Sequence, residues 1–315
     1  MKTARYLILR LIWMIITLLL IIVLVFFSTR LVMLTTWQRL AFLDALPIVK
    51  DEFTAYIRLI LTEWNWGETG YFRPESQTIL QIFKRKAPIT LKINAAALVT
   101  YVTFGIIIGI ISALNSHNFI DKILGIIIML LSALPNFIII WPLMIIFGYQ
   151  LGWLPRFYQV GSMYTPLNLV IPIVALSGMS IATIARFVRG ELIESLQSDY
   201  VLLAKTKGLT KTQATVKHAL RNSIAPVLPE IPSTFFVVIT GSFFVEVVYN
   251  VPGLATWFVK SMIPGYGATQ PPFVIDTPVV VIITIFYALL YQIAIFIIDI
   301  MYVIIDPRIK MGSKK

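Results

Sequence analysis

Residues 199–226 read DYVLLAKTKGLTKTQATVKHALRNSIAP, a polar and basic island between two long apolar runs. Asp199 suits the N-cap of a short helix, because its carboxylate accepts hydrogen bonds from free backbone donors. Gly208 fits a helix end that requires a positive φ, and Thr210 can cap a second helix through Val216 and Leu220. The segment therefore predicts a helix-turn-helix lying on the inner surface of a membrane.

The composition explains why this island stands out. Of the 315 residues, 58% are hydrophobic and only 13% are charged, which indicates a polytopic membrane protein. The net charge of +11 comes from basic residues at the ends of apolar runs, where they orient helices, so nucleic acid binding is not expected. The chain has no cysteine, which excludes disulfides, thiol nucleophiles and cysteine-ligated metal centres.

Six apolar runs have about the 20 residues that a membrane-spanning helix requires. They predict an all-α membrane protein with spans near Leu11–Phe27, Ile93–Leu114, Ile123–Phe147, Leu167–Val188, Val227–Val248 and Val279–Ile305. Residues 1–27 are interpreted as a retained first span, because no small-residue cleavage site follows the apolar run. Pro135 and Pro142 are expected to kink the third span.

Basic residues predict the orientation of these spans. The segment from Arg186 to Pro226 carries seven lysines and arginines, and residues 306–315 form a basic tail, so both are placed in the cytoplasm together with the N-terminus. Residues 28–92 then form a small external region, although Lys84, Arg85 and Lys86 run against the rule. Residues 53–61 predict an amphipathic helix, with Trp64 and Trp66 at the membrane surface. Residues 93–305 form a five-helix core that includes a loop at 189–226.

Polar residues in the apolar runs are candidates for a transport pathway, since such groups usually face protein or water inside a membrane. The candidates are Asn136, Ser180, Thr240 and Glu246. Packing between helices is the alternative for Ser180, and a solvated carboxylate at the membrane interface is the alternative for Glu246. Glu230 is interpreted as a helix-start residue and Asp299 as a packing residue. The two histidines, His117 and His218, are too few and too far apart to indicate a metal site.

Several segments resemble the permeases of peptide importers driven by ATP hydrolysis. Ala204 and Gly208, followed after nine residues by His218-Ala219-Leu220, are similar to the coupling loop of that family. The other landmarks, in chain order, are Ala87–Leu91, Ser132–Phe137, Leu151–Pro155, Val245–Leu254 and Asp306–Ile309. Together they resemble the B-type subunit of an oligopeptide, dipeptide or nickel importer. Leu202 stands where the general importer signature has Glu, and Arg221 where it has Pro, as in peptide-type members.

The resemblance implies a mechanism in which this chain hydrolyses nothing itself. An extracytoplasmic binding protein would deliver peptide to a pathway formed with a second permease, and two ATPase subunits would bind ATP and magnesium. Coupling to them would fall on Asp199, Tyr200, Leu203, Ala204, Lys205, Lys207, Gly208, Leu209, His218, Arg221 and Asn222. The sequence agrees in having no Gly-x-x-x-x-Gly-Lys-Ser/Thr loop.

Three alternatives stay open from the residues alone. The loop could be an ordinary solvated segment whose charges fix topology and contact anionic lipid. The chain could be an ion-coupled secondary transporter that uses Asp299 and Glu246 and works without an ATPase. It could also be a membrane scaffold or sensor, in which case changes at Gly208 would leave function normal.

Overall fold

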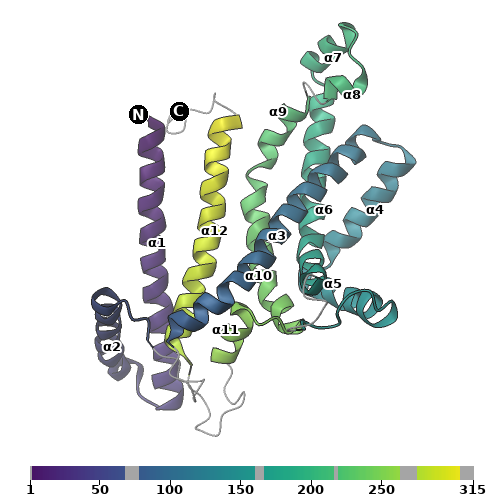
Figure 1. The fold of residues 1–315 in the computed structure, drawn as a ribbon. Coiled ribbons are helices and arrows are strands. Elements are labelled where there is room, and N and C mark those ends of the chain that lie inside the picture. The colour runs from purple at the N-terminus through teal and green to yellow at the C-terminus, as the bar shows by residue number, and fades with distance from the viewer. Residues whose placement is uncertain (1, 68–77, 160–166, 216–218, 263–274, 306–315) are drawn as a thin grey trace. The chain divides into compact units, whose positions relative to one another are not determined.

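The computed structural model describes residues 2–67, 78–159, 167–215, 219–262 and 275–305 (Figure 1). These residues are predominantly helical and form no β-strand, which confirms the all-α prediction. In chain order the elements are α1 (Lys2–Val32), η1 (Met33–Trp37), α2 (Phe42–Glu63), α3 (Ile79–Leu114), α4 (Phe119–Ala133), α5 (Asn136–Leu143), η2 (Met144–Gln150), η3 (Leu167–Leu169), α6 (Val170–Leu196), α7 (Asp199–Thr206), α8 (Lys211–Ala214), α9 (Leu220–Ile224), η5 (Ala225–Val227), α10 (Glu230–Val248), α11 (Leu254–Met262) and α12 (Thr277–Ile305).

Among the residues that the structure describes, five helical segments are long and apolar enough to cross a membrane: Ile8–Thr36, Ile79–Leu114, Leu167–Leu196, Glu230–Val248 and Thr277–Met301. The third predicted span is not one straight helix. It is broken into Phe119–Ala133 and Asn136–Gln150, which meet at an angle of 110°, so the total is six only if this pair counts as one span. Leu134 and Pro135 are both extended at the break. A residue before proline avoids the helical region, and Pro135 has no N–H to continue the helix.

The region 28–92, which the sequence predicts to be a small external region, is mostly helical over the residues that the structure describes. Its described residues belong to the end of α1, to η1 and α2, and to the first part of α3. The helix that contains the predicted second span begins at Ile79, and it carries Lys84, Arg85 and Lys86 before the predicted start of the span at Ile93. The amphipathic helix expected at 53–61 is part of α2. The placement of this region outside the membrane stays a prediction.

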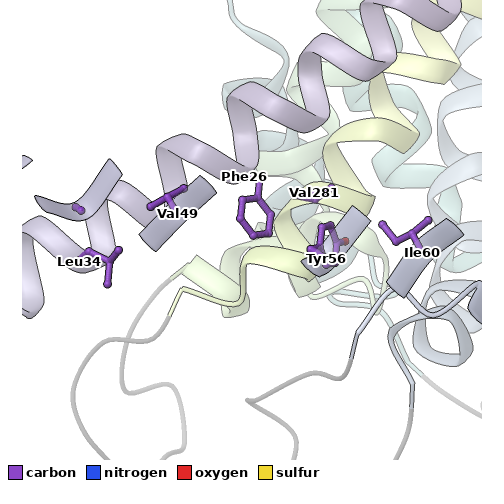
Figure 2. Packing of buried hydrophobic residues seen from close by; sticks show 7 residues of the cluster. Phe26, Leu34, Val49, Tyr56, Ile60 and Val281 are labelled. Atoms are coloured by element: carbon purple, nitrogen blue, oxygen red, sulfur yellow. The ribbon is translucent and has the colours of Figure 1, made fainter. Parts of the chain in front are cut away.

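The described chain divides into two compact units. The first comprises residues 3–91 and 250–292, and its core joins α1, α2 and the start of α12. Phe26 of α1 stacks on Tyr56 of α2 with ring centroids 5.1 Å apart, and Val281 packs in the same cluster (Figure 2). Arg30 and Glu52 form a two-pronged ion pair between α1 and α2, with Nε and Oε2 2.7 Å apart.

The second unit comprises residues 92–249 and the chain from residue 293, and it is built around α6. This helix contacts α4, α5, α9 and α10, and it is buried along most of its length. The second half of α3 also packs closely on α6. A Cβ atom at Gly105 would lie 2.7 Å from Cβ of Ile184, and one at Gly109 would lie 2.6 Å from Cβ of Val188. Glycines spaced by four residues let two helix backbones approach in this way.

Hydrogen bonds from buried side chains reinforce this unit. Tyr101 of α3 donates its hydroxyl proton to the carbonyl oxygen of Ile231 in α10, at 2.9 Å. Ser177 of α6 lies 3.3 Å from the carbonyl oxygen of Ala97 in α3. The three helices α3, α6 and α10 therefore hold one another by polar contacts as well as by packing.

The contact between α3 and α6 predicts different outcomes at two glycines. Gly109→Ala places a methyl group within 2.8 Å of the carbonyl oxygen of Ala185. We expect it to lower the free energy of unfolding by about 1–3 kcal/mol through overpacking. Gly125→Ala in α4 is the control, because a Cβ there meets nothing within 4 Å. Thermal unfolding of both purified variants measures the difference, and equal stabilities would contradict the close contact.

Candidate functional site

The hairpin formed by α7 and α8 packs on the ends of α3 and α6 through a small apolar cluster, which is called the platform below. The platform consists of the buried residues Ala113 at the end of α3, Leu192 near the end of α6, and Val201, Ala204, Ala214 and Ala219 of the hairpin segment. In Figure 1, α7 and α8 lie beyond the end of α6. One face of α7 is therefore occupied by contacts with the spans, which fixes the other face outward.

The outward face of α7 is apolar. Tyr200, Leu202 and Leu203 are exposed by 41%, 48% and 57%. Lys207, one turn after Leu203, is exposed as well. An apolar surface with flanking charge on a short helix is typical of a helix that lies in a groove of a partner protein.

Gly208 ends α7 in the way that its sequence predicted. Its φ is +87°, in the region that only glycine adopts without strain. The N–H of Leu209 donates to the carbonyl oxygen of Ala204 at 3.3 Å, the bond that defines a Schellman cap. Leu209 packs against the platform as well. The Ala204 and Gly208 pair thus has a structural basis in a buried contact and a left-handed turn.

Thr210 begins α8 with a reciprocal capping box. Its hydroxyl oxygen accepts from the N–H of Gln213 at 3.2 Å, while Oε1 of Gln213 accepts from the N–H of Thr210 at 3.1 Å. The predicted cap is confirmed. The predicted second helix is described in two parts, α8 as far as Ala214 and α9 from Leu220, and residues 216–218 between them lie outside the described chain.

Tyr200 connects α7 back to α6. Its hydroxyl oxygen lies 2.6 Å from Oγ of Ser195, and Ser195 also lies 3.2 Å from the carbonyl oxygen of Ala219. The pKa of the Tyr200 phenol lies below its usual value: burial raises it, but hydrogen bonds with Ser195, Ser198 and Asn222 lower it by more. This network fixes the orientation of α7 relative to both ends of the hairpin segment.

The remaining predicted coupling residues are placed as follows. Asp199 is the first residue of α7, so the N-cap position falls to Ser198, whose carbonyl oxygen accepts from Val201 and Leu202. Asn222 is exposed in α9. The side chains of Lys205 and Arg221 and all of His218 lie outside what the structure describes.

An ion pair between a buried carboxylate and a partly exposed guanidinium joins the helices next to the hairpin. Arg189 of α6 donates from Nε and Nη2 to the two carboxylate oxygens of Asp121 in α4, at 2.8 and 2.7 Å. The same carboxylate accepts from the hydroxyl of Ser112 at the end of α3 and from the N–H of His117, at 3.0 Å. Three helices therefore meet at one carboxylate. Sequence reasoning missed Asp121, although an acidic residue in the first turn of an apolar run was a usable signal.

A cleft of about 160 Å³, with hydroxyl and carboxylate groups among a largely apolar lining, lies between α6 and α10. Ser180, predicted as a pathway residue, lines it with its hydroxyl almost fully buried. Glu230, interpreted from sequence as a helix-start residue only, lines it as well. Sequence periodicity could not find this pairing, because it depends on how two distant helices meet.

The other predicted pathway residues lie outside this cleft. Asn136 is buried at the start of α5 beside Gly241, and neither atom of its amide finds a hydrogen-bond partner among the residues described. Glu246 is fully buried in α10. Thr240 is exposed, on the same side of α10 as Ser233 and Val237, and its hydroxyl donates to the backbone of its own helix.

Helices long and apolar enough to span a membrane, with a cleft between two of them and a helical hairpin at their ends, indicate a polytopic membrane protein. Residues 105–311 match the family described as "Binding-protein-dependent transport system inner membrane component". The chain belongs to this family.

Curated relatives agree with the family match. The chain is 30% identical to the dipeptide transport system permease protein DppB of Lactococcus lactis, over 98% of this chain and 99% of the relative. It is 30% identical to DppB of Bacillus subtilis over 84% and 80% of the two chains. It is 32% identical to the oligopeptide transport system permease protein OppB of Haemophilus influenzae, over 84% and 81%.

The ion pair next to the hairpin predicts a strong and specific loss of stability. Asp121→Ala leaves a guanidinium without its carboxylate, and we expect it to cost about 2–4 kcal/mol of unfolding free energy. Arg186→Ala, which removes an exposed arginine from the same helix as Arg189, should change stability by less than about 0.5 kcal/mol. A double-mutant cycle of Asp121→Ala and Arg189→Ala measures the coupling by thermal or denaturant unfolding. Additive effects would show that the two side chains do not interact.

Proposed function

We propose that the chain is a membrane-spanning permease subunit of an ATP-driven, binding-protein-dependent importer of oligopeptides, with dipeptides as the alternative substrate class. Its family and the names of its relatives support this function. The observation that carries it is the apolar outward face of α7, held on the platform by a Schellman cap and a capping box. A solvated loop that only fixed topology would need neither the caps nor exposed leucines.

The basic residues support a cytoplasmic position for this face. The segment from Arg186 to Pro226 holds seven lysines and arginines, and the positive-inside rule assigns such a segment to the cytoplasmic side. With six spans, both termini lie on that side as well. The hairpin then faces the compartment that contains ATP.

Coupling follows from how α7 is held. Leu203 and Tyr200 enter a groove of a partner ATPase subunit, and a movement of that groove displaces α7. The buried side of α7 passes the displacement to the ends of α3 and α6 through the platform. The middle of α6 lines the cleft, so one rigid helix links the ATPase contact to the pathway.

The proposal requires partners. Two ATPase subunits bind ATP and magnesium and carry out hydrolysis, a second permease completes the pathway, and an external binding protein delivers peptide. The names of the relatives favour peptide over nickel as the substrate. The family, whose members depend on a binding protein, favours a multi-subunit importer over an ion-coupled carrier that uses Asp299 and Glu246.

Co-purification tests the proposal directly. The tagged chain is isolated from native membranes in mild detergent, its partners are identified by mass spectrometry, and ATPase activity is assayed on the same sample. We expect a second permease, two nucleotide-binding subunits and ATP hydrolysis. A chain recovered alone or as a homo-oligomer, without ATPase activity, would favour the ion-coupled carrier instead.

Gly208→Ala is expected to uncouple transport from ATP hydrolysis. The substitution meets no atom within 4 Å, so its only cost is the positive φ, about 1–2 kcal/mol. Gly190→Ala in α6 is the matched control, since its surroundings are equally open and its φ is not positive. Peptide uptake per ATP hydrolysed should fall in the first variant and not in the second. Normal uptake by Gly208→Ala and by the bulkier Gly208→Val would contradict a coupling role for this turn.

A further inference from the structure

The cleft between α6 and α10 is rich in hydrogen-bond acceptors. Glu230, Ser233, Thr234 and Val237 recur at three- and four-residue spacing along one side of α10, facing Ser180 and Thr183 of α6. Thr183 donates its hydroxyl proton to the carbonyl oxygen of Met179 at 3.1 Å, and Thr234 donates to that of Glu230 at 2.7 Å. With their protons used inside their own helices, both hydroxyls offer only lone pairs to a ligand.

Ser180 adds an observation that points to a ligand. Its side chain is 1% exposed, lines the cleft, and has no hydrogen-bond partner among the described residues. A buried hydroxyl without a partner costs about 1–3 kcal/mol, which a bound polar group would recover. Glu230 carries the only charge among the lining residues, and it is negative.

We propose that this cleft binds the primary ammonium group of a peptide substrate, with the Glu230 carboxylate as counter-charge and Ser180 and Thr234 as neutral acceptors. The proposal rests on the proposed function and assigns a substrate group to the cleft. An ammonium group has three donors and no acceptor, which matches a site that offers acceptors and one negative charge. A carboxylate or phosphate group would be repelled by Glu230.

The size of the cleft agrees with this ligand. Protein cavities of about 150 Å³ bind a molecule of the size of benzene, so a cleft of about 160 Å³ admits an amino terminus with part of its first residue. The remainder of the peptide would extend along the exposed side of α10, which continues through Val237 and Thr240. Specificity for side chains is therefore not expected from this cleft.

The test is photo-crosslinking of a peptide probe to the complete importer complex in lipid nanodiscs. The binding protein is left out, so that its preference among peptides does not affect the labelling. The probe is the tripeptide alanyl-(p-benzoylphenylalanyl)-alanine, compared with its N-acetyl form. A third probe, N-acetylated but with lysine in place of the first alanine, distinguishes an amino-terminal from a side-chain ammonium. Mass spectrometry locates labelled residues, with Met179 and Val237 as the expected positions.

We expect the free-amine probe to label the cleft about tenfold more than the N-acetyl probe, as expected for loss of one charged hydrogen-bonded group. Glu230→Gln should remove this difference, Glu230→Asp should keep most of it, and Ser180→Ala should reduce it. Glu63→Gln, which changes an exposed carboxylate at the end of α2, should label as the unmodified complex does. Labelling by the lysine probe at the free-amine level would support a site for any primary ammonium.

Equal labelling by the free-amine and N-acetyl probes, or a difference that survives Glu230→Gln, would overturn the proposal. Uptake of a radiolabelled dipeptide into proteoliposomes, with the binding protein added, separates this failure from that of the proposed function. If the unmodified complex takes up peptide but the free-amine and N-acetyl probes label it equally, only the ammonium site is rejected. No uptake of any peptide rejects the import function, whatever the cleft binds.

Discussion

The close contact between α3 and α6 is the constraint on which the second unit depends. Gly105 faces Ile184, Gly109 faces Val188, and one turn further Ala113 and Leu192 share the platform, so the two helices run parallel up to their ends. Lipid gives helices no hydrophobic reason to associate, and small residues that permit dense packing supply the attraction instead. The position of α7 follows, because its buried residues pack on the ends that this contact brings together.

Helix α6 contributes residues to both the platform and the cleft. Its end carries the platform under α7, and its middle carries Ser180 and Thr183 of the cleft. Arg189, between these two regions, holds α4 and the end of α3 through Asp121. In the proposed coupling, a force on the hairpin would be distributed over three helices, since packed interiors transmit strain.

Local features of this chain were predictable from the sequence, and contacts between distant segments were not. The positive φ of Gly208 and the cap at Thr210 follow from residue chemistry within four positions. Proline at 135 indicated a kink, but the angle of 110° depends on what packs against both halves. Asp121 and Arg189, or Ser180 and Glu230, meet only once the helices are arranged. The Gly105 and Gly109 pair lies in a uniformly apolar run, where composition gives no contrast between faces.

The energetics of the outward face of α7 depend on its being rigid. Burying an apolar side chain of the size of leucine contributes about 1.5–3 kcal/mol, so Tyr200, Leu202 and Leu203 could supply several kcal/mol to an interface. A flexible loop would lose much of this in ordering its backbone and side chains on binding. In this chain the caps at Gly208 and Thr210 and the bond between Tyr200 and Ser195 order the hairpin beforehand. In the proposed contact with an ATPase subunit, little conformational entropy would be lost on binding, because the hairpin is already ordered in the folded chain. A small apolar surface could then bind tightly enough to move with its partner.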